Sequence, residues 1–170
     1  MTIEDKFVKL LEEMIHDSFS VVSKKDSKGI LSSWGILKDP CDIEKVALTI
    51  KEIDGRLMTI TAYTVKDNLK DIVYHFDLDG HTFNITTQIK DGEITSITPI
   101  LKAADWTERE LKELYDIKIT GHPNPSRLFL DETIEEGVMN QLMPLSEAMS
   151  GASSQTLWEK VMSSNQKEEN

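Results

Sequence analysis

Apolar residues near the start of the chain recur every three or four positions, which is the spacing of an amphipathic helix. Between Glu4 and His16 these positions are Phe7, Leu10, Leu11 and Met14. A second stripe of the same kind consists of Ile43, Val46, Ala47 and Ile50. Asp39 fits the N-cap of this second helix, with Pro40 at its first position, and Asp54-Gly55 marks its end. Each helix therefore has one apolar face that must pack on another element.

Between Arg56 and Ile100 the spacing changes to every second residue, which is typical of β-strands. Apolar and polar residues alternate within Met58–Ala62, Ile72–Leu78 and Phe83–Ile89. Asp79-Gly80 and Asp91-Gly92 follow two of these runs, and Asp-Gly favours a hairpin because both turn positions take positive φ. Asp67-Asn68 is the turn expected before them. The pattern predicts an antiparallel meander of about four strands, with one face that needs cover.

The two helices are the expected cover for this face, so the predicted fold is a two-layer α+β domain over residues 1–130. A short strand, Phe19–Ser23, and a polar turn, Lys24–Gly29, are expected between the helices. Residues 131–170 are predicted to form a C-terminal arm whose end is disordered unless docked. Its segments are Leu142–Met149, a joint at Gly151–Ser154, and an apolar stripe of Leu157, Trp158, Val161 and Met162, which either docks on a neighbour or folds back.

Composition narrows the class of function. Thirty acidic residues against nineteen basic ones give a net charge of −11, which repels a phosphate backbone, so we expect no nucleic-acid partner. No apolar run approaches the roughly 20 residues that cross a bilayer, and the N-terminus lacks the features of a signal peptide. Cys41 is the only cysteine, and the four histidines show no two-ligand metal spacing. We therefore expect a cytoplasmic chain without direct membrane insertion, and with no metal or cofactor of its own.

The stretch Ala104–Leu130 combines a helix start, a helix stop and a loop rich in proline. Thr107 and Glu110 fit a capping box, in which each side chain bonds the main-chain amide of the other residue. Trp106 and Leu111 then fall at the positions of a hydrophobic staple. The pattern thus predicts a helix that begins at Thr107.

The end of this stretch is expected to be stiff. A short strand is predicted at Ile117–Ile119, and Pro123 and Pro125 then hold the loop in extended conformations. His122 and Arg127 are therefore presented on a rigid loop. Local physics leaves alternatives open, because first-turn glutamates can be solvated charges, a lone histidine can be a structural hydrogen-bonding group and an arginine can pair locally.

The same stretch resembles the signature of a known family. It carries Trp-Thr-Glu-Arg-Glu, then Leu-Tyr, Ile-x-Ile and Gly-His-Pro-x-x-x-Arg-Leu, in that order. This series is similar to one in the 30 kDa subunit of respiratory complex I, and in its relatives in membrane-bound, energy-converting NiFe hydrogenase complexes. Val73-Tyr74-His75-Phe76 extends the similarity, which covers about Arg56 to Leu130.

The resemblance implies a cofactor-free accessory subunit of α+β fold, clamped to the hydrogenase-type large subunit of a multi-subunit oxidoreductase, near the iron–sulfur small subunit. The Ni–Fe centre and the iron–sulfur clusters would lie in these partners. Membrane subunits would be reached only indirectly, so the chain would lie peripherally on the cytoplasmic side of the cell membrane. The residues at matching positions are expected at the subunit interface: Glu108, Arg109, Glu110, Gly121, His122, Pro123 and Arg127.

Departures from the family pattern favour one type of complex. Glu113 stands at a position where the family usually has aspartate, and Asp116 at one where it usually has glycine. The basic Pro-Leu-Arg-Lys segment of quinone-linked members reads Pro-Leu-Ser-Glu at residues 144–147. The loss of basic residues favours ferredoxin- or formate-linked hydrogen production coupled to ion translocation. The alternative is the corresponding 30 kDa-type subunit of a NADH-, F420H2- or ferredoxin-linked quinone or phenazine oxidoreductase. A second alternative is a free-standing enzyme with His122 as general base, oriented by Glu108 or Glu110.

Overall fold

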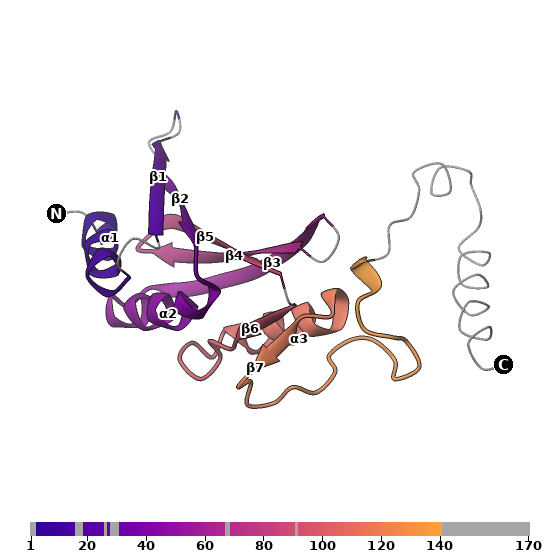
Figure 1. Ribbon diagram of the computed structural model, residues 1–170. Coiled ribbons are helices and arrows are strands. Elements are labelled where there is room, and N and C mark those ends of the chain that lie inside the picture. Colours follow the sequence, from indigo (N-terminus) through magenta and orange to yellow (C-terminus); the bar gives the residue numbers. More distant parts are fainter. Residues whose placement is uncertain are drawn as a thin grey trace. The chain divides into compact units, whose positions relative to one another are not determined.

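The computed structural model describes residues 3–15, 19–25, 27, 31–66, 69–90 and 92–140 (Figure 1). The chain divides into a compact unit that ends at Asn140 and a second unit, Gln141–Asn170. Three predicted segments lie wholly or partly outside the described residues: the arm after residue 140, the turn at Asp67-Asn68, and residues 26, 28 and 29 of the polar turn. Lys24 and Lys25 of that turn belong to the strand before it. Within the described part, none of the helices has the length and apolar character needed to cross a membrane.

The main sheet has five strands in the order β1-β2-β5-β4-β3. They are β1 (Phe19–Lys25), β2 (Leu31–Leu37), β3 (Arg56–Lys66), β4 (Leu69–Leu78) and β5 (His81–Ile89). The strands β3, β4 and β5 pair antiparallel, as the alternating pattern predicts. Asp79 and Gly80 both have positive φ, 52° and 83°, so the predicted hairpin turn between β4 and β5 is confirmed.

The predicted fourth strand of the meander is wrong. The segment after Gly92 forms β6 (Glu93–Thr95), which pairs in parallel with β7 (Lys118–Thr120) in a separate two-stranded sheet. The place beside β5 is taken by β2, which runs parallel to it. The apolar pattern did not predict β2, because the polar Ser33 is buried in this strand, whereas Trp34 and Ile36 are 45% and 58% exposed.

Both predicted N-terminal helices are present. They are α1 (Ile3–Met14) and α2 (Ile43–Glu52), the second preceded by a short 3-10 turn, η1 (Pro40–Asp42). The Asp39 carboxylate accepts a hydrogen bond from the Cys41 amide at 2.9 Å, so the predicted cap is confirmed. The stripe Ile43, Val46, Ala47 and Ile50 is fully buried. Asp54, at φ 57°, lies just beyond the end of α2.

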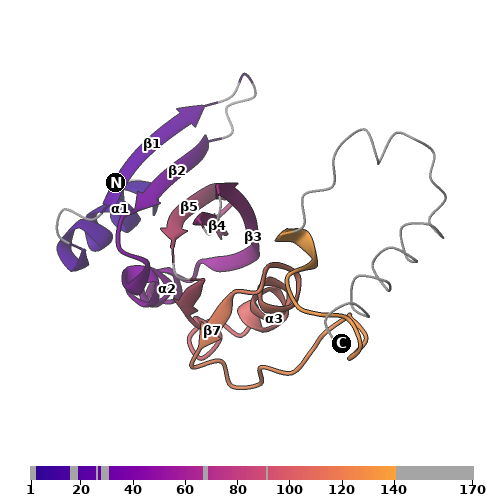
Figure 2. The ribbon, with the colours of Figure 1, turned by 45° about the vertical axis from the view of Figure 1, so that its right-hand side comes forward.

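The core lies between one face of the sheet and the helices. Phe7 of α1 packs edge-on against Phe83 of β5, with ring centroids 4.7 Å apart. Gly35 of β2 leaves room for the Phe19 ring, because a Cβ atom there would lie 2.5 Å from it. A third helix, α3 (Ala104–Tyr115), lies with α2 on the same side of β3–β5 (Figure 2) and buries Leu111. The α+β fold class is confirmed, and the predicted third helix covers the sheet together with the N-terminal helices.

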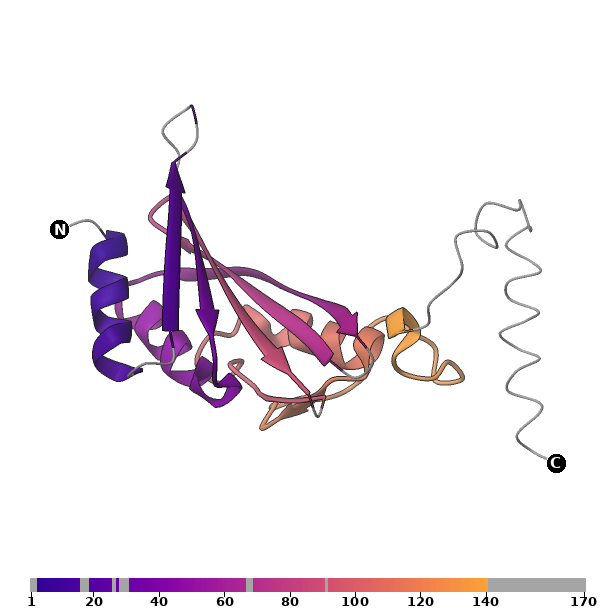
Figure 3. The same cartoon turned by 45° about the horizontal axis from the view of Figure 1, so that its top comes forward.

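The opposite face of the sheet has no helix over it among the described elements, and Figure 3 looks onto this face. A line of hydrogen bonds crosses its strands: Thr61 Oγ1 to His75 Nε2 at 3.0 Å, and His75 Nδ1 to Asn84 Oδ1 at 2.7 Å. The Asn84 amide donates in turn to the Ser33 carbonyl at 3.3 Å. These polar groups are therefore satisfied within the sheet itself.

Candidate functional site

Helix α3 begins three residues earlier than the sequence predicts. Its N-cap is Ala103, which has no side-chain cap, and the Thr107 hydroxyl donates to the Ala104 carbonyl at 3.0 Å. The predicted capping box of Thr107 and Glu110 is therefore wrong. The predicted staple is wrong as well, because Trp106 is 63% exposed within the helix. The helix start is instead fixed by a side chain on its inner face.

That side chain is Glu108, which is 1% exposed. Its carboxylate accepts three hydrogen bonds of 2.6 Å, from the Ser96 hydroxyl, the Ile97 amide and the Thr98 hydroxyl. Glu108 thus ties α3 to the segment that follows β6. The Glu108 carboxylate therefore points into the protein and forms no i, i+4 ion pair with Lys112. A buried carboxylate needs such donors, since they replace the water it has lost.

His122 is the second buried group, with a side chain only 1% exposed. Its Nδ1 accepts a hydrogen bond from the Asn124 amide at 3.0 Å, and its Nε2 lies 3.3 Å from the Asp105 carbonyl. These partners place the proton on Nε2. The same nitrogen lies 3.3 Å from Asp105 Oδ1 and 3.7 Å from Glu108 Oε2. His122 therefore joins the proline loop to the first two turns of α3.

Two cations on α3 bind main-chain carbonyls of the loop. Arg109 donates to the carbonyls of Ser126 at 2.9 Å and Arg127 at 2.7 Å. Lys112 donates to the carbonyl of Pro125 at 3.0 Å. Because three successive carbonyls of the loop are held in this way, its path across the helix is fixed by charged side chains and not by apolar burial.

Glu113 binds the following turn through its amides. Its carboxylate accepts from the main-chain N–H groups of residues 128, 129 and 130 at 3.2, 2.9 and 2.9 Å. Burial acts to raise the pKa of Glu113, but these three donors, together with the nearby Arg127, outweigh it and hold that pKa below the ordinary value of 4.5. Sequence reasoning missed this role. The available signal was an acidic residue at a position where the resembled family also has an acid.

Arg127 closes the next turn of the loop. Its Nη1 donates to the carbonyls of Asp131 at 2.6 Å and Ile134 at 2.7 Å. The Asp131 carboxylate accepts from the amide and hydroxyl of Thr133, and these donors, with a smaller contribution from Arg127, lower its pKa. The segment from Gly121 to Glu136, called the α3 loop below, is therefore bound to α3 and to itself by ionic side chains.

The structure thus brings most of the predicted site residues together. Glu108 and His122 lie inside, Arg109 and Arg127 hold the α3 loop, and Gly121 and Pro123 are exposed. Glu110 makes no hydrogen bond or ion pair through its carboxylate within the part of the chain that the structure describes. Whether these residues form a subunit interface stays a prediction. Asp116, which replaces a family glycine, has the left-handed conformation at the end of α3, φ 52° and ψ 47°.

Two large aromatic side chains are left exposed on this unit, Trp106 at 63% and Phe129 at 62%. Trp106, Arg109 and Glu113 are spaced three and four residues apart, so they share one stripe of α3. The main chain at Phe129 lies beside that stripe, because its amide donates to the Glu113 carboxylate. The two aromatics therefore mark one surface, with roughly 10 Å of helix between Trp106 and Glu113.

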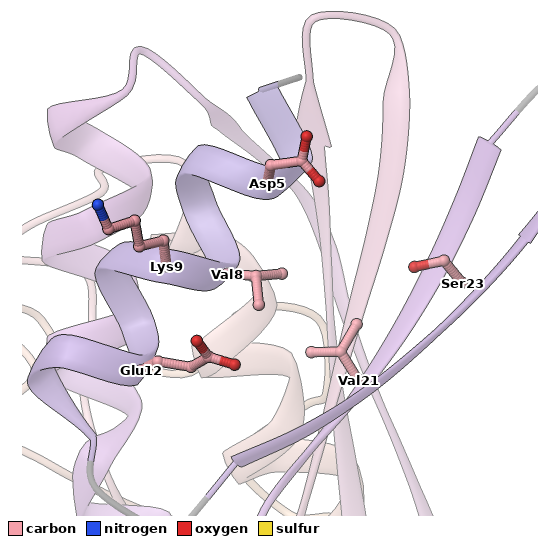
Figure 4. A pocket seen from close by; sticks show the side chains of 6 residues that line it. All are labelled: Asp5, Val8, Lys9, Glu12, Val21 and Ser23. Atoms are coloured by element: carbon pink, nitrogen blue, oxygen red, sulfur yellow. The ribbon is translucent and has the colours of Figure 1, made fainter. Parts of the chain in front are cut away.

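A cavity of about 460 Å³ lies elsewhere, between α1 and β1 (Figure 4). It is lined by Asp5, Val8, Lys9, Glu12, Val21 and Ser23. This lining contains neither histidine nor cysteine and none of the predicted site residues. Across the described ranges, no three residues of the types histidine, cysteine, aspartate and glutamate are grouped so as to hold a metal ion.

Comparisons with known proteins cover α3, the α3 loop and most of the rest of the fold. Residues 36–155 match the model of the family described as the respiratory-chain NADH dehydrogenase 30 kDa subunit. An NADH-quinone oxidoreductase C-type subunit from Methylobacterium radiotolerans is 33% identical over 86 residues, 49% of this chain and 40% of that protein. The probable 30.4 kDa subunit of the mitochondrial NADH-ubiquinone oxidoreductase of Candida maltosa is 33% identical over 84 residues, 46% and 30% respectively. The chain thus spans less than half the length of these curated relatives.

Solved structures show the same fold at low sequence identity. A trypsin-resistant fragment (1-134) of Nqo5 matches with a TM-score of 0.54 and 20% identity, over 70% of this chain and 98% of the fragment. A chain of the membrane-bound sulfane sulfur reductase, an archaeal respiratory membrane complex, matches with a TM-score of 0.68 and 15% identity, over 90% of this chain and 95% of that one. With the family model covering well over half its length, this chain belongs to the family of the 30 kDa subunit of the respiratory-chain NADH dehydrogenase.

Proposed function

We propose that this chain is an accessory subunit of a membrane-bound oxidoreductase, and that it docks on a hydrogenase-type large subunit near an iron–sulfur small subunit. The docking surface is the α3 loop together with the outer face of α3. In this proposal the Ni–Fe centre and the iron–sulfur clusters belong to the partner subunits. The chain reaches the cytoplasmic side of the membrane only through those partners.

The observation that carries the proposal is the way the α3 loop is held. Arg109, Lys112 and Glu113 bind loop carbonyls and amides with their charged groups, so the surface is ordered before any partner arrives. Preorganisation lowers the entropy cost of association. The exposed aromatics on this surface, Trp106 and Phe129, are of the residue types that anchor interfaces.

The geometry assigns two roles to the predicted interface residues. Glu108 and His122 have buried side chains, so they position the surface from inside. Arg109 and Arg127 hold the loop through its carbonyls. The remaining three predicted residues stay available for contact with a partner: Glu110, Gly121 and Pro123.

The proposed parent complex produces hydrogen from ferredoxin- or formate-derived electrons and couples this to ion translocation. The loss of the basic segment at residues 144–147 supports this version. The second candidate is the 30 kDa-type subunit of a NADH-, F420H2- or ferredoxin-linked quinone or phenazine oxidoreductase. One observation favours it: the relatives from Methylobacterium radiotolerans and Candida maltosa are themselves subunits of NADH-quinone and NADH-ubiquinone oxidoreductases.

The geometry of His122 weighs against the free-standing enzyme. A general base needs a free lone pair that faces the substrate. The acceptor nitrogen of His122 is already bonded to the Asn124 amide, and the ring is 1% exposed. The enzyme alternative therefore lacks an accessible base at the residue chosen for it.

Purification of the native complex through a tag on this chain tests the proposal. We expect a large subunit with two Cys-x-x-Cys pairs, an iron–sulfur small subunit, and nickel in the metal analysis. A large subunit without these pairs, and no nickel, would move the assignment to the quinone-linked candidate. Recovery of the chain alone, from cells that make the whole complex, would overturn both.

Variants of the exposed aromatics test the docking surface. Trp106→Ala with Phe129→Ala should weaken binding to the large subunit by at least about thirtyfold, because two anchors of about 1–2 kcal/mol each are lost. The amount of chain that co-purifies with the large subunit should fall accordingly. Val22→Ala with Ile36→Ala, which alters exposed apolar residues of the sheet, is the matched control. Equal losses of co-purification in the two double variants would show that α3 and the α3 loop do not form the docking surface.

A further inference from the structure

A groove of about 290 Å³ lies between α3 and β3. One wall is α3 itself, through Leu114 and Tyr115, and the other is β3, through Thr61 and Ala62. This volume is at the low end of the roughly 300–1,000 Å³ of small-molecule pockets, which suits a few side chains better than a cofactor.

The groove is held open by the element at its end, η2 (Val138–Asn140). Asn140 donates from its amide nitrogen to the Tyr115 carbonyl at 2.9 Å, and its amide oxygen accepts from Thr64 Oγ1 at 3.3 Å. One residue thus bridges α3 and β3. Met139 next to it lines the groove while it is 56% exposed, and Figure 2 shows η2 beside both walls. The groove is therefore preformed and has an apolar surface that nothing among the described residues covers.

The charge of the groove lining indicates which kind of side chain would bind in it. Glu110 is the charged residue of the lining, and its carboxylate has no hydrogen bond or ion pair in the described part of the chain. It lines the groove together with Leu114 and Met139, so a cation that binds it forms an ion pair beside apolar surface, where the attraction is stronger than at a fully open surface. In contrast, the acids Glu108 and Glu113 on the same helix are each satisfied by three donors.

We propose that this groove receives a segment of a neighbouring subunit that carries an apolar side chain next to a lysine or arginine. The apolar side chain packs between Ala62, Leu114 and Met139, and the cation pairs with Glu110. The inference rests on the proposed function, because it requires that the chain is assembled with other subunits. It adds a second contact next to the aromatic surface, because Glu110 follows Trp106 by four residues on α3.

The outer edge of β3 supports an extended partner segment. β3 is the last strand of the sheet and pairs with β4 alone among the described strands, so it has an open edge, and four of its residues line the groove. Exposed strand edges bind extended segments through main-chain hydrogen bonds, and side chains then select the partner. Glu110 and Met139 would provide that selection here.

A photo-crosslinking amino acid at position 139, in place of Met139, tests the inference in the complex purified from cells that make every subunit. We expect a cross-link to a different subunit, within a peptide that has an apolar residue beside lysine or arginine. Glu110→Lys should lower the cross-link yield about tenfold and Glu110→Gln less, because reversal adds repulsion to the lost attraction. Glu52→Lys, a charge reversal at the end of α2, is the matched control. Reversal of the partner's basic residue should restore the yield with Glu110→Lys.

Several outcomes would overturn the inference. They are a cross-link to residues 141–170 of the same chain, a cross-link to a second copy, no cross-link in a fully assembled complex, or a yield that Glu110→Lys leaves unchanged. In each of these the chain still co-purifies, so the proposed function survives and the groove assignment alone fails. A chain that does not co-purify with any subunit refutes the proposed function, and the groove assignment with it.

Discussion

The main sheet and the α3 loop belong to one compact unit, yet different interactions hold them in place. The sheet is held by apolar side chains on one face, such as Phe83 and Ile85, which are 1% and 0% exposed. The α3 loop is held by Arg109, Lys112 and Glu113, which bond its main-chain carbonyls and amides. Burial is non-directional, whereas charge-assisted hydrogen bonds fix a particular path. The loop therefore presents a defined surface without a core of its own.

The largest effect should come from Glu108, which ties α3 to the segment that follows β6. Glu108→Ala leaves three buried donors without an acceptor, and each costs about 1–3 kcal/mol, so the free energy of unfolding should fall by about 4 kcal/mol. Chemical denaturation of the isolated chain measures it. Glu110→Ala, on the same helix, should change stability by less than about 0.5 kcal/mol. Equal effects of the two variants would contradict the inward role of Glu108.

A smaller loss is expected within the sheet. In Gly35→Ala the new Cβ would lie 2.5 Å from the Phe19 ring, and overpacking of this kind costs about 1–3 kcal/mol. The loss should appear in global unfolding, because β1 and β2 carry part of the core. Gly80→Ala, where a Cβ meets nothing within 4 Å but φ is 83°, separates backbone strain from overpacking. Full stability of Gly35→Ala would show that Phe19 can move at little cost.

The α3 loop should respond to pH through Glu113. The pKa of Glu113 is lower in the folded protein than its ordinary value of 4.5. Its contribution is therefore complete above pH 4.5 and is lost as pH falls through the folded-state pKa. Glu113→Gln should lower stability by about 1–2 kcal/mol at pH 7 and flatten the loss of stability below pH 4.5. Denaturation curves between pH 3 and pH 7 measure this, and an unchanged acid profile in the variant would contradict it.

The smallest effect concerns the end of α3. Asp116 has positive φ, 52°, a conformation that glycine adopts without the strain of a Cβ atom. Asp116→Gly should raise the free energy of unfolding by about 0.5 kcal/mol, and Asp116→Ala should lower it by about 1 kcal/mol. Thermal unfolding resolves the two changes. The same sign for both variants would mean that the Asp116 side chain, and not its backbone, matters here.

The way each region is held also explains which of its elements could be predicted from the sequence. α1, α2 and the strands β3–β5 were predictable because their apolar residues repeat with the period of the element and lie on its buried side. β2 was not, since it buries Ser33 and exposes Trp34. In this strand a polar side chain is buried and apolar ones are exposed, so its position in the sheet follows from its pairing with β1 and β5 and not from its apolar pattern.

The site was predictable in its members but not in their roles. The family resemblance selected Glu108, Arg109, His122 and Arg127, and the structure gathers all four around the α3 loop. Charged residues on a helix are usually solvated, so the sequence alone favoured side chains that face outward. Glu108 and Arg109 in fact bond groups that lie 10 to 18 residues away in the sequence, which no local spacing encodes.

Hydrogen exchange of the amides of residues 128–130 in the isolated chain tests most directly whether the docking surface is preformed. These amides should exchange slowly in the free protein, because the Glu113 carboxylate accepts from all three. Glu113→Ala should make them exchange fast while the amides of β4 and β5 keep their protection. Fast exchange in the unaltered free chain would contradict a preformed surface and would mean that the α3 loop is ordered only by its partner.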